Sequence, residues 1–283
     1  MSTEKTIVIT GGGIGLGAQL TRLYGHAGHR VIICGRTESA LRAAEDYGKV
    51  HSFCLDLSDS GDRRRFVEGI YDLDRPIDLL INNAGILRDK SFGKMEQKDW
   101  DIVVDVHLNG TAKVTRAVWP IMKEQQYGRI VVTASSSGLY GNFGQANYGA
   151  AKLGVAGFMN TLKIEGQKDN IKVNTLAPVA FTRMTENLMP PEAEAMLKPE
   201  FVSPGVMILV SEDAPTGNIL CAGAGVFAAA QIVESDGVYL GRDDLSAEKV
   251  LEAWDQITDF SNAKPFFMGG EQTGKFFEKA SGK

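Results

Sequence analysis

Short β-branched runs alternate with longer amphipathic segments from Thr6 onward, and this alternation limits the possible folds more than any other feature. Several runs, such as Ile7-Val8-Ile9, are apolar at every position, which is typical of strands buried on both faces of a sheet. Strands that alternate with helices predict right-handed βαβ units and a doubly wound parallel sheet covered by helices on both faces. We therefore expect an α/β fold.

The alternation defines the expected elements. We expect strands at residues 6–10, 30–34, 50–55, 77–82, 129–133, 171–176 and 218–222. We expect helices at residues 15–26, 37–47, 59–71, 100–123 and 147–166.

A single domain with a C-terminal extension is the expected organisation, because the sequence has no internal repeat and no low-complexity linker. We place the domain at residues 1–245 and the extension at residues 246–283. The extension carries one more amphipathic segment, residues 247–258, followed by a loose end rich in Gly and Lys. A chain of 283 residues is ample for a large buried core.

The charge and the metal-binding residue types exclude several functions. The net charge is −5, so neither a nucleic acid nor an anionic membrane has electrostatic support as a partner. The four histidines form no metal-ligand spacing, and we expect no protein-bound metal. Cys34, Cys54 and Cys221 lie far apart in apolar runs and are expected to be buried and reduced.

We find no membrane span and no targeting signal. Residues 214–233 carry no charge, but Pro215, Gly223 and Gly225 interrupt them, so we expect a buried strand and a glycine loop instead of a transmembrane helix. The N-terminus has no long apolar region, and the last three residues are Ser-Gly-Lys, not the peroxisomal Ser-Lys-Leu. We therefore expect a cytoplasmic protein.

A glycine-rich turn, Gly11-Gly12-Gly13-Ile14-Gly15-Leu16-Gly17, joins the first strand directly to the first helix. Glycine permits a tight turn and lets a pyrophosphate approach the backbone without a clash with Cβ. The N-terminus of the helix offers free N–H groups and a partial positive charge. The sequence therefore predicts a Rossmann-like dinucleotide site, with Gly11, Gly13, Gly15, Leu16 and Gly17 as cofactor-binding residues.

The residues after the second strand bear on the choice of dinucleotide. An acid there accepts hydrogen bonds from the adenosine ribose and favours NAD, but Gly35 stands in that place and Arg36 follows. Arginine pairs with a 2′-phosphate, so we expect NADP. In the alternative, Arg36 is a surface cation, Glu38 contacts the ribose, and NAD is possible. Asp56 and Leu57, after the third strand, are expected beside the adenine, unless Asp56 only caps a helix.

Three polar residues after the fifth strand form a candidate catalytic set. Ser135 follows the strand, Tyr148 comes thirteen residues later, and Lys152 comes four residues after the tyrosine. The spacing of four places Tyr148 and Lys152 on one helix face. Tyrosine has a reference pKa near ~10, too high for a proton shuttle at neutral pH, and a nearby ammonium lowers it. Ser135 can hold the substrate oxygen beside the phenol.

The glycine turn, the run Asn82-Asn83-Ala84-Gly85, Ser135, Tyr148 and Lys152 together resemble the short-chain dehydrogenase/reductase family over about residues 6–225. The resemblance implies a Rossmann-like domain that binds NAD(P) and forms a dimer or tetramer. It implies Tyr148 as general acid/base, Lys152 as the residue that lowers the tyrosine pKa and holds the nicotinamide ribose, and Ser135 as the residue that orients the substrate. Asn83, Ala84 and Gly85 end the fourth strand at the ligand-binding edge and are expected to contact the cofactor.

Two places depart from the family pattern. His107, in the run Val106-His107-Leu108-Asn109-Gly110, stands where the family usually has a catalytic asparagine. That family residue acts largely through its backbone carbonyl, so His107 is kept as a candidate catalytic residue. After the sixth strand, Thr182 follows Pro178 one residue sooner than in the family, and we do not assign it to the nicotinamide carboxamide.

Within the family, several segments are similar to the (3R)-hydroxyacyl-CoA dehydrogenase part of the peroxisomal multifunctional enzymes of type 2. They are residues 84–89, 106–110, 137–148, 183–185, 197–201 and 222–225. That class oxidises (3R)-hydroxyacyl-CoA thioesters with NAD and also has histidine at the place of His107. It carries an acid where Gly35 stands. The resemblance thus implies a thioester substrate and NAD, whereas Arg36 favours NADP.

Residues 179–201 are expected to form a substrate lid. Their flexible apolar side chains suit an acyl chain, although ordinary helix packing explains them equally well. These residues are Phe181, Met184, Leu188, Met189, Met196 and Leu197. The nearby cations Arg88, Lys90 and Lys94 are candidate contacts for the phosphates of CoA.

We predict an NAD(P)-dependent oxidoreductase of fatty acid metabolism that interconverts a secondary alcohol and a ketone by hydride transfer, with a 3-hydroxyacyl/3-oxoacyl thioester as substrate. One alternative is a reductase of another bulky ketone, such as a steroid or a polyketide. Another is a non-catalytic NADP-binding protein, against which the intact Ser135, Tyr148 and Lys152 argue. A hydratase or isomerase needs a paired carboxylate or an Asp/His dyad in the lid, and none is present.

The resemblance to the family implies a homodimer or homotetramer through the helices at residues 100–123 and 147–166, and a monomer leaves their apolar faces exposed. We hypothesise that the tail after Ser246 completes a partner subunit's site, which truncation at Gly241 tests.

Overall fold

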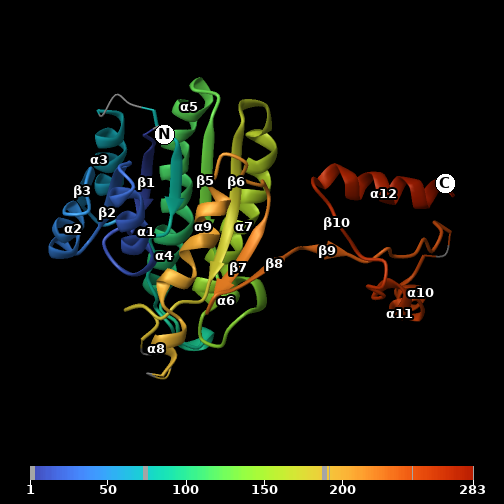
Figure 1. Ribbon diagram of the computed structural model, residues 1–283. Helices are drawn as coiled ribbons and strands as arrows, with labels where there is room; N and C mark the ends of the chain where they lie inside the picture. The colour runs from blue at the N-terminus through green and yellow to red at the C-terminus, as the bar shows by residue number, and fades with distance from the viewer. Residues whose placement is uncertain (1–3, 73–75, 187–189, 191, 244, 283) are drawn as a thin grey trace. The chain divides into compact units, whose positions relative to one another are not determined.

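A computed structural model describes residues 4–72, 76–186, 190, 192–243 and 245–282 (Figure 1). The chain divides into two compact units, Met1–Ala229 and Ala230–Lys283. The expected division at residue 245 stays a prediction.

In the described residues, the first unit contains an eight-stranded sheet of order β3-β2-β1-β4-β5-β6-β7-β8. Every pairing from β3 to β7 is parallel, which confirms the expected doubly wound α/β sheet. The strands are β1 (Thr6–Thr10), β2 (Arg30–Gly35), β3 (Val50–Cys54), β4 (Leu79–Asn82), β5 (Gly128–Thr133), β6 (Ile171–Pro178), β7 (Ile219–Gly223) and β8 (Val226–Ala230).

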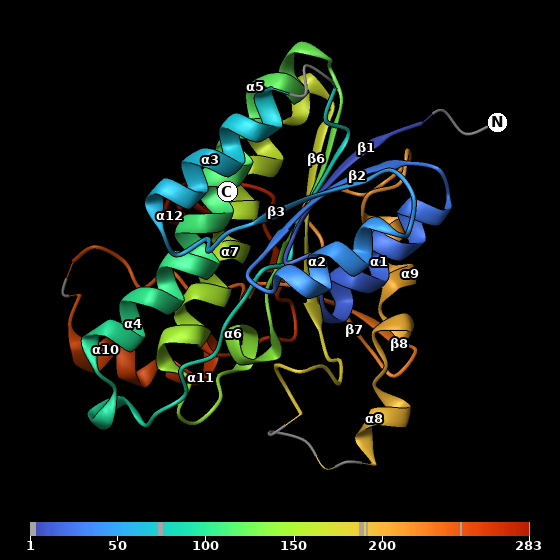
Figure 2. The same cartoon turned by 90° about the vertical axis from the view of Figure 1, so that its left-hand side faces the viewer.

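Helices cover both faces of the sheet (Figure 2). One face carries α1 (Gly15–His26), α2 (Glu38–Glu45) and α9 (Ser203–Leu209), whose apolar side chains join those of the strands in one buried cluster. The other face carries α3 (Ser60–Tyr71), α4 (Gln97–Val104), α5 (Thr111–Glu124) and α7 (Ala146–Glu165). Burial on both faces is why β1 is apolar along its whole length.

The expected elements agree with β1–β7 and with α1, α2, α3 and α7 to within two residues at each end. The single helix expected at residues 100–123 is wrong, because a π-helical turn, Asp105–Gly110, separates α4 from α5. Three short α-helices, α6 (Ser136–Tyr140), α8 (Ala193–Met196) and α9, and the strand β8 were not expected. Cys34 is buried as expected, but Cys54 is exposed because β3 is the outermost strand.

The second unit contains β9 (Val233–Glu234), β10 (Lys264–Pro265), α10 (Ala247–Glu252), α11 (Trp254–Ile257) and α12 (Gly269–Ser281). The helix expected at residues 247–258 is present as α10 and α11. The loose end expected after it is wrong, because its last part forms α12. Ion pairs from Lys275 to Glu234 and from Lys279 to Asp236 hold this helix beside β9.

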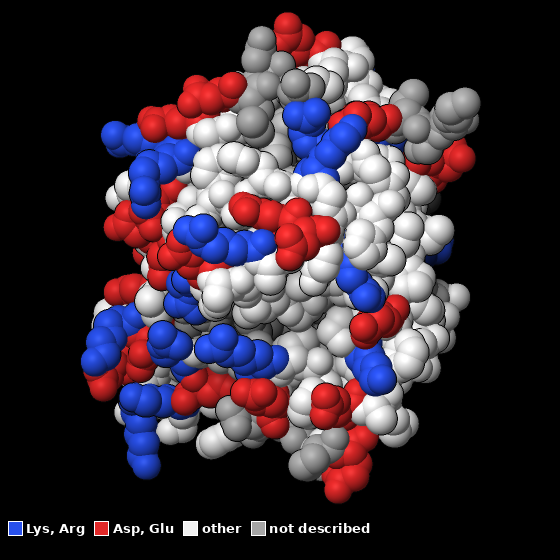
Figure 3. Space-filling model, turned by 60° about the vertical axis from the view of Figure 1, so that its left-hand side comes forward, with Lys and Arg blue, Asp and Glu red and all other residues white. Residues whose placement is uncertain are grey.

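Among the described residues, no helix has the length and hydropathy needed to span a bilayer. Figure 3 shows basic and acidic side chains interspersed on one face of the molecule. This face therefore offers no large surface of one sign to a polyanion.

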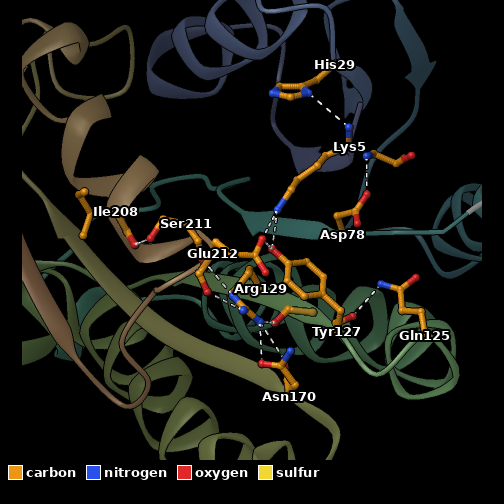
Figure 4. Close-up of polar contacts among 12 residues, drawn as sticks. Lys5, His29, Asp78, Gln125, Tyr127, Arg129, Asn170, Ile208, Ser211 and Glu212 are labelled. Atoms are coloured by element: carbon orange, nitrogen blue, oxygen red, sulfur yellow. Dashed lines mark hydrogen bonds and ion pairs between the residues drawn. The ribbon is translucent and has the colours of Figure 1, made fainter. Parts of the chain in front are cut away.

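A buried arginine joins three loops at the edge of the sheet where the strands begin (Figure 4). Arg129, in β5, is 1% exposed. Its guanidinium donates to the backbone carbonyls of Gly128, Asn170, Ser211 and Glu212 at 2.8–3.0 Å. It also stacks on the ring of Tyr127, 4.2 Å from the ring centroid. The arginine thus ties the start of β5 to the loop before β6 and to the loop after α9.

Replacement of Arg129 by Met should lower the free energy of unfolding by about 1–3 kcal/mol, because one buried and three partly buried carbonyls lose a charged donor and the stacking on Tyr127 is lost. Urea unfolding at fixed protein concentration measures the change. The matched variant Arg22→Met, on the exposed side of α1, should change it by less than about 0.5 kcal/mol. Equal losses in the two variants contradict the role assigned to Arg129.

Candidate active site

The candidate site lies where the chain reverses its strand order. β1 lies between β2 and β4, so the carboxyl ends of β1 and β4 border the crevice in which open α/β sheets bind ligands. A cleft of about 340 Å³ lies there, within the size range of small-molecule sites. Its walls come from the glycine turn, the ends of β4, β5 and β6, and the start of α7.

The glycine turn brings α1 against the end of β1. A Cβ at Gly17 would lie 2.0 Å from the carbonyl oxygen of Gly11, so only glycine fits there. Gly15 has φ +55°, in the left-handed region that favours glycine. Gly15 and Leu16 line the cleft, whereas Gly11 packs against Ala84, Gly13 against Leu41 of α2, and Gly17 against Gly11.

The Thr10 hydroxyl ties the glycine turn to the end of β4. Its oxygen accepts hydrogen bonds from the backbone N–H of Asn83 at 3.0 Å and of Ala84 at 3.1 Å. The Asn83 side chain donates to the carbonyl of Gly11 at 3.3 Å. Asn83, Ala84 and Gly85 therefore line the same cleft as the turn.

The residues expected to contact the adenosine ribose and adenine lie outside this cleft, just after β2 and β3. We call this place the ribose end. The Arg36 guanidinium lies 3.6 Å from the Asp56 carboxylate, and both side chains are partly exposed. The other oxygen of Asp56 accepts from the backbone and hydroxyl of Ser58 at 2.8 Å. The Glu38 carboxylate accepts two hydrogen bonds from Arg42, so it is already paired. Leu57 is buried.

Ser135, Tyr148 and Lys152 all line the cleft. Ser135 is the N-cap of α6, and its Oγ accepts a hydrogen bond from the Ser137 N–H at 3.2 Å. Tyr148 and Lys152 lie one turn apart on α7. Lys152 Nζ lies 5.6 Å from the centroid of the Tyr148 ring and donates to the carbonyl of Thr133 at 2.5 Å.

Burial is the largest cause of the pKa shifts of Tyr148 and Lys152. It raises the pKa of Tyr148, and a hydrogen bond with Ser135 opposes that rise. It lowers the pKa of Lys152 to about 7. Both shifts disfavour the charged forms, so in the protein alone the phenol is not poised as the sequence led us to expect.

Replacement of Lys152 by Met should change how stability depends on pH. The unfolded lysine keeps its proton up to its ordinary pKa of 10.5, while the folded one loses it near 7. The unfolded state therefore binds more protons between these values, and the free energy of unfolding of the wild type should rise with pH relative to that of Lys152→Met.

Urea unfolding of the cofactor-free protein between about pH 7 and pH 10 measures this difference. The exposed lysine variant Lys113→Met is the control and should run parallel to the wild type. A Lys152→Met profile that is also parallel would show that the folded lysine keeps its ordinary pKa.

His107 lies in the π-helical turn and is 2% exposed. Its Nε2 lies 2.8 Å from the carbonyl oxygen and 3.0 Å from the backbone nitrogen of Ile86. Its ring meets the Tyr148 ring edge to face at 5.0 Å. Burial lowers the pKa of His107 well below its ordinary value, so the ring is neutral at pH 7. The ring therefore acts here as a neutral support for the loop after β4 and for Tyr148.

Of the residues expected to form the substrate lid, only some line the cleft. Met184 lines the cleft, whereas Phe181, Met196 and Leu197 do not. Leu188 and Met189 lie outside the described residues. Thr182 lines the cleft, and a Cβ at Gly15 would lie 3.2 Å from its methyl group.

The cations proposed for CoA do not line the cleft. Lys90 lies 3.5 Å from Asp99 and 3.7 Å from Glu96, and Arg88 donates to the neighbouring carbonyl of Leu87. Lys90 and Arg88 thus already have protein partners close to them in sequence.

Some cleft residues were not singled out from the sequence, namely Ser137, Asn142, Gln145 and Arg183. Gln145 is buried and accepts from Ser137 Oγ at 2.7 Å while donating to Asp89 at 2.7 Å. It thus joins the loop after β4 to the start of α7. A polar residue three positions before Tyr148 was the available signal, but spacing alone does not reveal a contact across two loops.

No group of three or more His, Cys, Asp or Glu side chains in the described part of the chain is placed to hold a metal ion.

Known proteins share both the sequence and the fold. Residues 5–193 match the family model described as short chain dehydrogenase. Peroxisomal multifunctional enzyme A of Dictyostelium discoideum is 39% identical over 92% of this chain and 61% of its own length. The 3-oxoacyl-[acyl-carrier-protein] reductase of Thermotoga maritima is 36% identical over 76% of this chain and 95% of its own length.

The solved structure of full-length peroxisomal multifunctional enzyme type 2 from Drosophila melanogaster has a TM-score of 0.85 and 33% sequence identity. The match covers 99% of this chain and 50% of that one. The chain spans between 30% and 61% of the length of the first peroxisomal relatives that it matches.

Proposed function

The chain belongs to the short-chain dehydrogenase/reductase family, as its motifs predicted, and from this premise we propose that it interconverts 3-hydroxyacyl and 3-oxoacyl thioesters with a nicotinamide dinucleotide. The observation that carries the proposal is the meeting of Ser135, Tyr148 and Lys152 on the wall of one cleft with the glycine turn.

The cleft fits a dinucleotide. The turn leaves no room for a Cβ at Gly17, so α1 begins against the end of β1 and its N-terminal N–H groups face the cleft, where a pyrophosphate binds in such folds. His107 Nδ1 and Thr133 Oγ1 are buried on the cleft wall without a partner among the described residues, so the cleft has polar atoms left for a ligand. When bound, NAD(P) supplies or accepts the hydride. The residues proposed to hold it are Gly11, Gly13, Gly15, Leu16, Gly17, Arg36, Asp56, Leu57, Asn83, Ala84, Gly85, Tyr148 and Lys152.

The chain's own residues handle the proton and the orientation of the substrate. We assign Tyr148 as the general acid that protonates the ketone oxygen, and as the base in the reverse direction. Ser135 holds the same oxygen through its hydroxyl. Lys152, whose pKa burial lowers to about 7, favours the phenolate when it is protonated. Neutral His107 holds the loop at Ile86 and supports the Tyr148 ring.

Two observations support a thioester. One relative with 36% identity is named a 3-oxoacyl-[acyl-carrier-protein] reductase, and others are named peroxisomal multifunctional enzymes. Another bulky ketone, steroid-like or polyketide-like, is the alternative substrate. A non-catalytic NADP-binding role is the remaining alternative, and it gives no reason for Ser135, Tyr148 and Lys152 to line one cleft.

The absorbance of the nicotinamide, measured with a short and a medium 3-oxoacyl-CoA, tests the activity. We expect turnover by the wild type and a loss of about 10²–10⁴-fold in kcat for Tyr148→Phe, because the proton donor is gone. Tyr47→Phe, outside the cleft, is the matched control and should keep its rate. Cofactor binding without turnover of either thioester contradicts the thioester proposal. A retained rate in Tyr148→Phe contradicts the mechanism.

We propose that NADP is preferred over NAD, because Arg36 is exposed at the ribose end and Glu38 is paired with Arg42. The type 2 relatives imply NAD, which stays the alternative.

Replacement of Arg36 by Ala should weaken NADPH binding about tenfold or more and leave NADH binding within about twofold, because only NADPH carries the 2′-phosphate. Equilibrium titration of nicotinamide fluorescence measures both affinities. Glu38→Gln is the control and should change neither. A wild type that prefers NADH, with binding weakened by Glu38→Gln, contradicts the assignment and supports the alternative.

We further propose a homodimer or homotetramer. Leu153 on α7 is 45% exposed, and Trp254, Phe260, Phe276 and Phe277 in the second unit are each more than half exposed. Light scattering of the full chain and of a chain truncated at Gly241 tests the oligomeric state and the role proposed for the tail.

The cytoplasmic location also stays a prediction, because some relatives are named peroxisomal. Microscopy of a tagged chain tests it.

A further inference from the structure

Arg183 is an exposed cation at the wall of the cleft. Its side chain forms no ion pair or hydrogen bond with any of the described residues. No acidic residue of the described part lines this cleft. The other charged lining residue, Lys152, is fully buried and bonded to the Thr133 carbonyl. Arg183 is therefore the cation on this wall that remains available to an anionic ligand.

A hydrogen-bonded turn fixes the position of Arg183. The Thr182 N–H donates to Thr185 Oγ1 at 2.9 Å, and the Thr185 hydroxyl donates to the carbonyl of Ala180 at 2.7 Å. The Met184 N–H donates to Thr182 Oγ1 at 3.2 Å. These bonds close the backbone on both sides of Arg183, so the side chain extends from a defined turn.

This turn packs against the start of α1. The Thr182 methyl group lies 3.2 Å from where a Cβ of Gly15 would be, and both residues line the cleft. The N-cap position of α1, Ile14, has no side-chain hydrogen bond to the first helical N–H groups. Those donors are thus free to bind an anion beside the turn that carries Arg183.

We infer that Arg183 forms an ion pair with the pyrophosphate of the dinucleotide bound at the glycine turn. The inference rests on the proposed cofactor site and is independent of the proposed substrate. CoA is the other source of phosphate in this cleft. The contact between Thr182 and Gly15 favours the cofactor, because it places the Arg183 turn at the glycines and not at the loop of Arg88 and Lys90.

Calorimetric titration of Arg183→Gln, without substrate, tests the inference. The dissociation constants of NADPH and NADH should both rise about tenfold, because each loses the same charge-assisted contact to its pyrophosphate. The dissociation constant of 2′-AMP, which has no pyrophosphate, should change by less than about twofold. Arg183→Lys should retain part of the affinity, since it keeps the charge but not the paired donors.

Arg22→Gln, an exposed arginine of α1 outside the cleft, is the matched control and should leave all three constants unchanged. Unchanged NADPH and NADH binding in Arg183→Gln overturns the inference. Weakened binding of free CoA alone also overturns it and assigns Arg183 to the substrate. A wild type that binds neither dinucleotide overturns the proposed function itself, so the two failures are distinguishable.

Discussion

The first helix begins so close to the first strand that no side chain fits between them. The distance of 2.0 Å from a Cβ at Gly17 to the Gly11 carbonyl oxygen shows how closely the two segments approach. This approach aims the N-terminus of α1 at the crevice beside β1. The Thr10 hydroxyl then ties the end of β4 to the same turn. The cofactor half of the site therefore follows from one steric constraint and one hydroxyl group.

The catalytic half is built from polar groups that burial disfavours. Lys152 is fully buried with its pKa lowered to about 7, and the pKa values of Tyr148 and His107 are shifted by burial as well. Such groups reduce the stability of the folded chain, and they are found where a ligand completes the surroundings. At the opposite edge of the sheet, Arg129 pairs fully with backbone carbonyls. His107 Nδ1 and Thr133 Oγ1 on the cleft wall thus keep unused hydrogen-bonding capacity, whereas every guanidinium nitrogen of Arg129 is bonded.

Different physical interactions determine the residues at the glycine turn and at the ribose end of the proposed cofactor site. At the glycine turn, the conformation of the backbone permits few residues other than glycine, so the motif is recognised directly in the sequence. At the ribose end, we propose that a few exposed charges decide between NAD and NADP, and the pairing of these charges depends on neighbours from other elements. Arg36 meets Asp56 from the segment after β3, while Glu38 is held by Arg42 one turn later. The differences in free energy between the possible charge pairings at the ribose end are small, because exposed ion pairs contribute little to stability.

The sequence by itself determined the order of the strands from β1 to β7, the glycine turn, and the grouping of Tyr148 with Lys152, because each depends on local periodicity or on a spacing within one helix. It did not reveal β8, whose pairing is decided across the sheet, or α12, whose glycines weaken the helical signal and whose lysines pair with Glu234 and Asp236. Only the tertiary structure placed His107 against Ile86, Gln145 between two loops, and the Arg183 turn on Gly15. These contacts join residues about 20 to 170 positions apart, and no local pattern encodes them, because loop packing follows from the whole fold.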